Sequence, residues 1–298
     1  MHTNNPVLTR AEAFQPQEEP YYGSGQPAAG RQPYGQPYAG QPYAGQPYGT
    51  DPYQPYGQAP QPFVQASGVM TIDDVLTKTA ITMGLLILSA AASFYMLGTI
   101  TARTGSLAPV ASIATVTGLI AFGTVLLVSF RRGVNPAFVL LYSVIEGVFI
   151  GTISLVFNVL YPGIVLPAAF GTFVAAGVTL AAYKYLRIKV SSKFRKMVMI
   201  GTMALAGVYL INFLLSLVGV PLGIISVSGP VSGVAILMSV LGVGLAVFNL
   251  ILDFDYIERG IAVGASARES WRAAFGLTVT MVWLYIELLR VLSYFARR

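Results

Sequence analysis

The sequence Asn249-Leu-Ile-Leu-Asp-Phe-Asp-Tyr-Ile-Glu-Arg259 joins a long apolar run to a cluster of charged residues. Three acids stand where that run ends, namely Asp253, Asp255 and Glu258. Two further acids lie inside other apolar runs, namely Glu146 and Glu287. A long apolar run that closes in charges is typical of a helix that crosses a membrane and ends at its surface. A carboxylate at bilayer depth costs about 2.5 to 3.5 kcal/mol on insertion scales, so acids inside such runs indicate a functional or paired group.

The composition is that of a membrane protein. Hydrophobic residues make up 55% of the chain and charged residues only 10%, against about 25% charged in ordinary soluble domains. Cysteine is absent and His2 is the single histidine, which excludes disulfides, thiol chemistry, histidine metal sites and histidine-based triads. The net charge of +6 does not indicate nucleic acid, because the basic residues gather in short loops between apolar runs.

Seven apolar runs follow one another along the chain, and each is near or above the ~20 residues that a membrane-spanning helix needs. They lie at about 79–98, 108–130, 136–160, 163–183, 197–218, 233–252 and 273–295. Ahead of the first run, Thr71 followed by Asp73 and Asp74 predicts a capped helix start. The sequence therefore predicts an all-α, seven-helix transmembrane domain over residues 69–298.

Residues 1–68 have a different composition. The triplet Gln-Pro-Tyr recurs from positions 32, 36, 41, 46 and 54, separated by glycine and alanine. Such a density of proline and glycine predicts a disordered tail with polyproline II character. The tail has no signal-peptide pattern, so we expect it to stay in the cytoplasm. Two interpretations of the tail remain. It is either a solvated spacer or a tyrosine-rich segment for docking or self-association.

The loop charges predict the orientation. Loops two, four and six together carry eleven basic residues, namely Arg131, Arg132, Lys184, Arg187, Lys189, Lys193, Arg195, Lys196, Arg259, Arg268 and Arg272. Loops one, three and five carry only Arg103. We expect the protein to lie in the inner (plasma) membrane of the cell. The positive-inside rule then places the N-terminus in the cytoplasm and the C-terminus outside. Arg297 and Arg298 conflict with that outer end, so a short or re-entrant last helix stays an alternative.

The third run carries Glu146 beside a face of small and polar residues. That face comprises Ser143, Gly147, Ile150, Gly151, Ser154 and Asn158. Gly147 and Gly151 form a small-x-x-x-small pair that allows two helices to approach closely. Two interpretations of Glu146 remain: a protonated, hydrogen-bonded packing residue, or part of a proton- or cation-linked site.

The sixth run places Gly242, Ala246, Asn249 and Asp253 on one face, whereas Asp255 lies about 160° further round the helix. Asp253 and Asp255 are either an ordinary charged helix end or part of an ion path. Acids at a helix C-terminus oppose the macrodipole, so a compensating partner is expected. Arg131 or Arg132, at the end of the second run, has the matching depth.

The seventh run has one broad face that carries Thr280, Trp283, Glu287, Arg290 and Tyr294. Glu287 and Arg290 are three residues apart, which predicts an intrahelical ion pair. Counted from the cytoplasmic helix starts at 1.5 Å per residue, Glu287 lies roughly 21 Å deep and Glu146 about 15 Å deep. These depths allow the two acids to share one cavity.

Five features together resemble the Bax inhibitor-1 family, also called transmembrane Bax inhibitor motif proteins. They are the seven runs, the Arg-Arg pair after the second, Tyr142-Ser-Val-Ile-Glu-Gly147, Ile251-Leu-Asp-Phe-Asp-Tyr-Ile257 and Ile286-Glu-Leu-Leu-Arg290. The resemblance covers about residues 70–298. The tail and the Leu-Asp-Phe-Asp-Tyr-Ile-Glu form resemble an actinobacterial branch of that family.

The resemblance implies a pH-sensitive calcium leak, gated by a pair of aspartates on the last two helices and an arginine on the second. If the family motif is aligned on an isoleucine four residues after the aspartate, Asp253 is the sixth-helix aspartate. If it is aligned on an aromatic residue just before the aspartate, Asp255 is that residue. The arginine matches Arg131 or Arg132. The partner aspartate of the seventh helix falls on Thr280, which is a departure from the family pattern.

These observations predict passive or proton-linked cation conduction, with Ca²⁺ as the transported ion, because bare carboxylates suit a hard cation. The alternative is a non-conducting regulator that binds other membrane proteins, such as a quality-control protease, through its helices and its tail. An enzyme is not expected, because the sequence shows no nucleophile–base pair and no metal cluster. The lipid bilayer and membrane proteins are the expected partners, and no cofactor or nucleic acid is expected.

Overall fold

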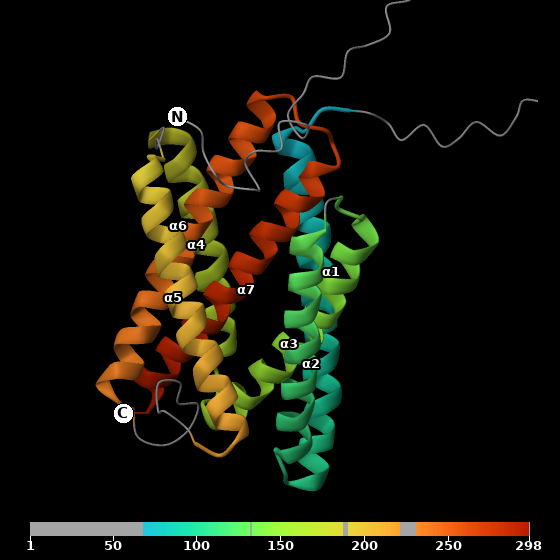
Figure 1. The fold of residues 1–298 in the computed structure, drawn as a ribbon. Helices are drawn as coiled ribbons and strands as arrows, with labels where there is room; N and C mark the ends of the chain where they lie inside the picture. Colours follow the sequence, from blue (N-terminus) through green and yellow to red (C-terminus); the bar gives the residue numbers. More distant parts are fainter. Residues whose placement is uncertain (1–67, 132, 187–189, 221–230, 298) are drawn as a thin grey trace, which may run out of the picture. The chain divides into compact units, whose positions relative to one another are not determined.

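The computed structural model describes residues 68–131, 133–186, 190–220 and 231–297. Within them the chain forms seven α-helices (Figure 1), namely α1 (Ile72–Thr104), α2 (Ala108–Phe130), α3 (Pro136–Leu160), α4 (Val165–Leu186), α5 (Ser192–Leu217), α6 (Gly233–Ala262) and α7 (Glu269–Ala296). All seven are long and apolar enough to cross a membrane. The predicted all-α, seven-helix membrane architecture is confirmed. The predictions for the tail, Arg132, Arg187, Lys189 and Arg298 fall outside the described residues.

Polar side chains cap the starts of several helices. The Thr71 hydroxyl accepts a hydrogen bond from the Asp74 amide, as the sequence predicts, at 3.2 Å. Asn135, Ser191 and Ser232 cap α3, α5 and α6 in the same way. Each cap satisfies an amide that has no partner inside its helix, so the local sequence defines where these helices begin.

The closest helix pair is α1 and α3. A Cβ atom at Gly147 would collide with the Leu86 carbonyl, and one at Gly151 would collide with the Ala90 carbonyl. Because the glycines bring the backbones together, Ser89 Oγ can donate a hydrogen bond across the interface to the Val144 carbonyl at 2.8 Å. The predicted small-x-x-x-small contact is therefore confirmed, and α1 is its partner.

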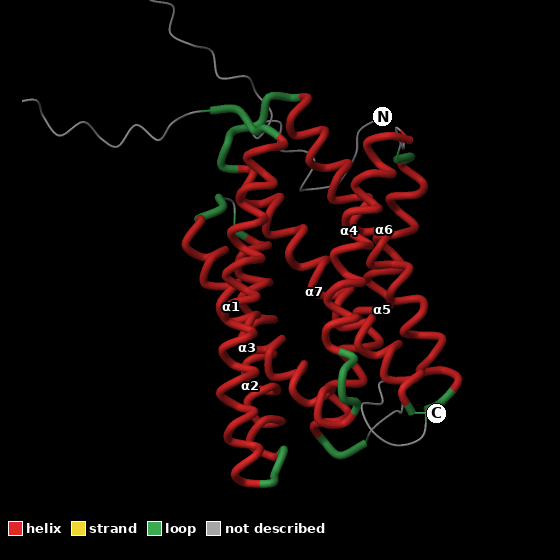
Figure 2. The backbone as a smooth tube through the Cα atoms, turned by 180° about the vertical axis from the view of Figure 1, so that it is seen from behind, coloured by secondary structure: helices red, strands yellow, loops and turns green. Residues whose placement is uncertain are grey.

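The last helix lies between two groups of helices. Figures 1 and 2 show α1, α2 and α3 to one side of α7 and α4, α5 and α6 to the other. α7 packs against α1, α3, α4 and α6, whereas α2 packs mainly on α3 and α5 mainly on α6. Helices α2 and α5 are thus the outer helices of the two groups.

The segment before α1 is tied to the connection between α6 and α7. The Met70 amide donates to the Ala265 carbonyl at 2.7 Å, and the Ala267 amide donates to the Gly68 carbonyl at 2.8 Å. The Met70 side chain is 1% exposed, and Lys78 Nζ binds both the Asp74 carboxylate and the Ala267 carbonyl. The start of α1 and the charged end of α6 therefore form one rigid edge of the bundle.

Candidate functional site

Asp253 lies in the α6–α7 interface. The Thr280 hydroxyl donates a hydrogen bond to Asp253 Oδ2 at 2.7 Å. The half-buried carboxylate also lines a pocket of about 320 Å³ that is bounded by the end of α2 and by Tyr256 and Arg272. The structure thus brings together the two residues that the family resemblance aligned with the aspartate pair, and a hydroxyl group stands in the place of the second carboxylate.

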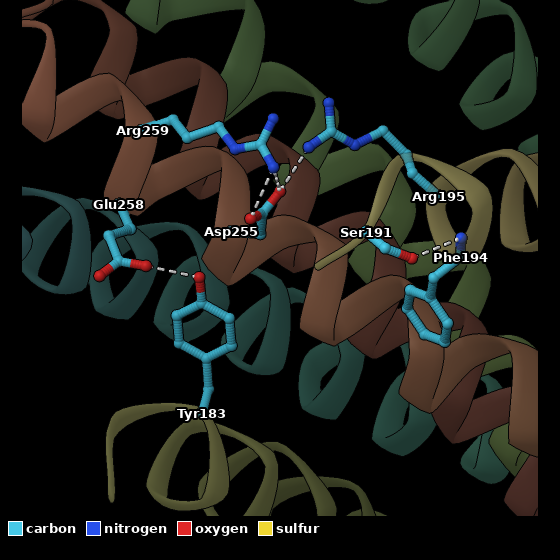
Figure 3. A network of polar contacts seen from close by, with 7 residues as sticks. All are labelled: Tyr183, Ser191, Phe194, Arg195, Asp255, Glu258 and Arg259. Carbon is cyan, nitrogen blue, oxygen red and sulfur yellow. Dashed lines mark hydrogen bonds and ion pairs between the residues drawn. The ribbon is translucent and has the colours of Figure 1, made fainter. Parts of the chain in front are cut away.

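Asp255 occupies a different environment, although it is only two residues away. Its carboxylate is bound by Arg195 Nη2 at 2.7 Å and by Arg259 Nη2 at 2.9 Å (Figure 3). Asp255 is 7% exposed, so the two arginines neutralise a nearly buried charge. The same figure shows Glu258 accepting a hydrogen bond from the Tyr183 hydroxyl of α4 at 2.6 Å.

A compensating partner of Asp255 is Arg195. The predicted partners were Arg131 or Arg132, and Arg132 lies outside the described residues. Arg131 does not pair with Asp255; its guanidinium carbon lies 4.4 Å from the centroid of the Phe138 ring. Arg195 has that role because the start of α5 lies beside the end of α6. The sequence carried one signal for this, namely the concentration of basic residues in predicted loop four.

Glu287 lies at the centre of the bundle and is 0% exposed. It accepts hydrogen bonds from Arg290 Nη1 at 3.0 and 3.1 Å and from Trp283 Nε1 at 3.2 Å. The structure therefore contains the ion pair that the spacing of Glu287 and Arg290 predicts. On α6, Gly242 makes room for the carboxylate, since a Cβ atom there would come within 2.6 Å of Glu287 Cδ.

A cavity of about 860 Å³ opens between α2, α3, α5 and α7. Both Glu146 and Glu287 line it, as their predicted depths allow, and Arg290 lines it beside Glu287. Glu146 is 6% exposed, and no described residue forms a hydrogen bond or an ion pair with its carboxyl group. It is therefore the bare acid of this cavity.

Asn249 is directed to α5 and does not join Asp253. Its amide nitrogen donates to Thr202 Oγ1 at 2.7 Å and to the Leu245 carbonyl at 2.8 Å. The helical-wheel prediction of one shared face is correct in angle, but the face is wide enough for its members to contact different helices. Thr202 in turn lines the large cavity.

The acids of the bundle do not form a metal cage. Among the described residues, no three histidine, cysteine, aspartate or glutamate side chains gather closely enough to hold a metal ion. The pocket at Asp253 and the cavity lined by Glu146 and Glu287 are thus two separate polar sites in the helix bundle. A carboxylate with few neighbouring oxygens binds a hard cation weakly and releases it readily.

The fold and these membrane-embedded acids define a multi-pass membrane protein of seven helices. The family model described as Bax inhibitor 1 like matches residues 5–297, which is nearly the whole chain. The chain belongs to this family, and the resemblance inferred from its motifs is confirmed. A comparison with curated proteins found no match.

Proposed function

We propose that this protein conducts cations across the membrane, passively or in a proton-linked manner, with Ca²⁺ as the transported ion. The observation that carries the proposal is that two carboxyl groups within the helix bundle, those of Asp253 and Glu146, have no basic partner among the described residues. Asp253 has a single hydroxyl donor and Glu146 has no bonded partner among the described residues, whereas Asp255 and Glu287 are each paired with arginine. Bare acids in the bundle carry an insertion cost that plain packing does not explain.

In this proposal Asp253 and Thr280 have the place of the aspartate pair that the family resemblance implies. One carboxylate and one hydroxyl group cannot share a proton as two carboxylates do. We therefore infer that the α6–α7 contact opens and closes around a single titrating group. Sensitivity to pH then depends on Asp253 and on the second bare acid, Glu146.

Flux into proteoliposomes tests this function. The purified full-length protein is reconstituted around a Ca²⁺-sensitive dye, with protein-free vesicles as the blank. Glu146→Gln is compared with Asp73→Asn, which removes an equal charge from the exposed first turn of α1. We expect Ca²⁺ entry that Glu146→Gln alters and Asp73→Asn does not. Entry no faster than in the blank would exclude conduction.

We further propose that the role is non-enzymatic, that the protein resides in the plasma membrane with its N-terminus in the cytoplasm, and that membrane proteins are its partners. The Lys/Arg distribution supports the orientation. One observation bears on the region that follows the tail: residues 68–70 are fixed to the α6–α7 connection. If the protein is a regulator without conduction, removing residues 1–65 abolishes partner capture from native membranes and the reconstituted protein carries no flux.

A further inference from the structure

The cavity between α2, α3, α5 and α7 is larger and more apolar than a cation path requires. Its volume of about 860 Å³ falls in the range of about 300–1,000 Å³ that is typical of pockets for small organic ligands. Its charged lining residues are Glu146, Glu287 and Arg290, and the last two neutralise each other. The remaining lining is mostly hydrocarbon and aromatic, so most of the cavity suits an apolar molecule.

Exposed apolar side chains of α2 and α5 border the cavity. Four of its lining residues are also among the exposed large hydrophobic side chains of α2 and α5, namely Leu119, Phe122, Leu210 and Leu214. These side chains lie at the border between the cavity and the surface that a membrane-spanning helix presents to lipid. A ligand that enters here must therefore dissolve in hydrocarbon, and a charged ligand would meet the large cost of burying an ion.

Two polar groups of the cavity have no hydrogen-bond partner among the described residues, namely the Tyr209 hydroxyl group and the Glu146 carboxyl group. Glu146 is 6% exposed and forms no hydrogen bond within the described residues, whereas the Glu287 oxygens accept bonds from Trp283 and Arg290. Buried carboxyl groups are nearly always hydrogen-bonded. Glu146 thus offers a neutral ligand one acceptor position for an O–H group.

Six aromatic rings line the cavity together with aliphatic side chains. The rings that line the cavity are those of Phe122, Tyr142, Phe149, Tyr209, Phe213 and Trp283. Aromatic side chains pack favourably against another ring in stacked or edge-to-face arrangements. We propose that the cavity binds a neutral, lipid-soluble hydroxyaromatic molecule, a phenol or a hydroquinone, whose hydroxyl group donates a hydrogen bond to Glu146. This proposal does not depend on conduction.

Quenching of Trp283 fluorescence tests the proposal. Trp283 lines the cavity, whereas Trp271 lies away from it, under Lys78, and is replaced by Phe to leave one reporter. The full-length protein in lipid vesicles is titrated with 4-bromo-2-hexylphenol, whose bromine quenches tryptophan on contact, and with its methyl ether, which has no O–H donor. We expect saturable quenching by the phenol and roughly tenfold weaker binding of the ether, from the loss of one hydrogen bond.

Two variants separate the cavity from the surrounding lipid. Glu146→Leu should remove the preference for the phenol over the ether. Ala206→Phe, at an exposed position of α5 that lines the cavity, should abolish saturable quenching by both probes, and its folding does not depend on a buried site. Quenching that rises linearly with probe concentration, or equal affinity for the two probes in the parent protein, would overturn the proposal. Loss of Ca²⁺ flux bears only on conduction, because this titration contains no ion gradient.

Discussion

Asp253 and Asp255 are separated by one residue, and the α-helix turns that separation into opposite environments. Two steps of 100° rotate the second carboxylate to the far side of α6. Asp253 therefore meets the Thr280 hydroxyl of α7, whereas Asp255 meets Arg195 at the start of α5. One acid stays unneutralised beside a pocket, and the other belongs to an ion-pair network.

Thr280→Asp tests whether the Asp253–Thr280 contact controls the pH response. The change places a second carboxyl group against the first, and two carboxyl groups in contact release their protons in two coupled steps. We expect the pH dependence of Ca²⁺ flux, measured in proteoliposomes, to show one step more than that of the parent protein. Thr280→Asn adds a polar group without a second acid and serves as the control. Superimposable pH profiles for the two variants would contradict this role.

Glu287→Gln should destabilise the protein strongly. The change leaves the Arg290 guanidinium, whose side chain is 13% exposed, without its counter-charge, at a cost of about 3–5 kcal/mol. The double variant Glu287→Gln/Arg290→Gln removes both charges and should regain most of that loss. Thermal unfolding in detergent compares the two. Equal stability of the single and double variants would show that the unpaired charge of Arg290 is not the cause of the destabilisation.

Sequence spacing predicts contacts within a helix better than contacts between helices. The Glu287–Arg290 pair follows from three residues of separation, and the depths of Glu146 and Glu287 correctly allow a shared cavity. Arg195 lies 60 residues from Asp255, and no local pattern selects it over Arg131. The partnership of Asp253 with Thr280 came from the family resemblance and not from spacing.

Helices α1 and α6 extend well beyond the apolar runs that predict them, whereas α2 and α3 match their runs. α1 begins at Ile72, seven residues before the predicted run, and α6 continues to Ala262, ten residues beyond it. Hydropathy marks the part of a helix that lies in hydrocarbon, whereas caps and backbone hydrogen bonds define where it ends. The consequence is functional, because the acids from Asp253 to Glu258 are held on a helix in fixed directions and not on a loop.

Gly147→Ala should weaken the α1–α3 pair. Its Cβ atom would collide with the Leu86 carbonyl, and overpacking of this kind costs about 1–3 kcal/mol. Gly123→Ala on α2 is the matched control, because nothing lies within 4 Å of a Cβ atom there; alanine also favours the helix. Lower thermal stability of Gly147→Ala alone is the expected result. Equal unfolding temperatures of the two variants would mean that α1 and α3 accommodate the added methyl group without losing stability.

The orientation of the whole molecule rests on its basic loops, and the chain has no cysteine of its own to confuse labelling. We expect Lys193→Cys, at the start of α5, to resist a membrane-impermeant maleimide in intact cells. Thr104→Cys, at the C-terminal end of α1 and on the predicted outer side of the membrane, should react with the same maleimide. Both positions are exposed, so burial does not explain a difference. The reverse pattern would place the N-terminus outside.

Ca²⁺ flux through Asp253→Asn and Asp255→Asn, measured side by side in proteoliposomes, tests the central claim most directly. The two changes remove the same charge from one helix two residues apart, but only Asp253 lines a pocket without an arginine partner. Flux is divided by the amount of folded protein, since Asp255→Asn leaves Arg195 unpaired and lowers stability. We predict altered flux per folded molecule for Asp253→Asn and unaltered flux for Asp255→Asn. Parental flux in both variants, or an equal change in both, would contradict the assignment of Asp253 to the ion path.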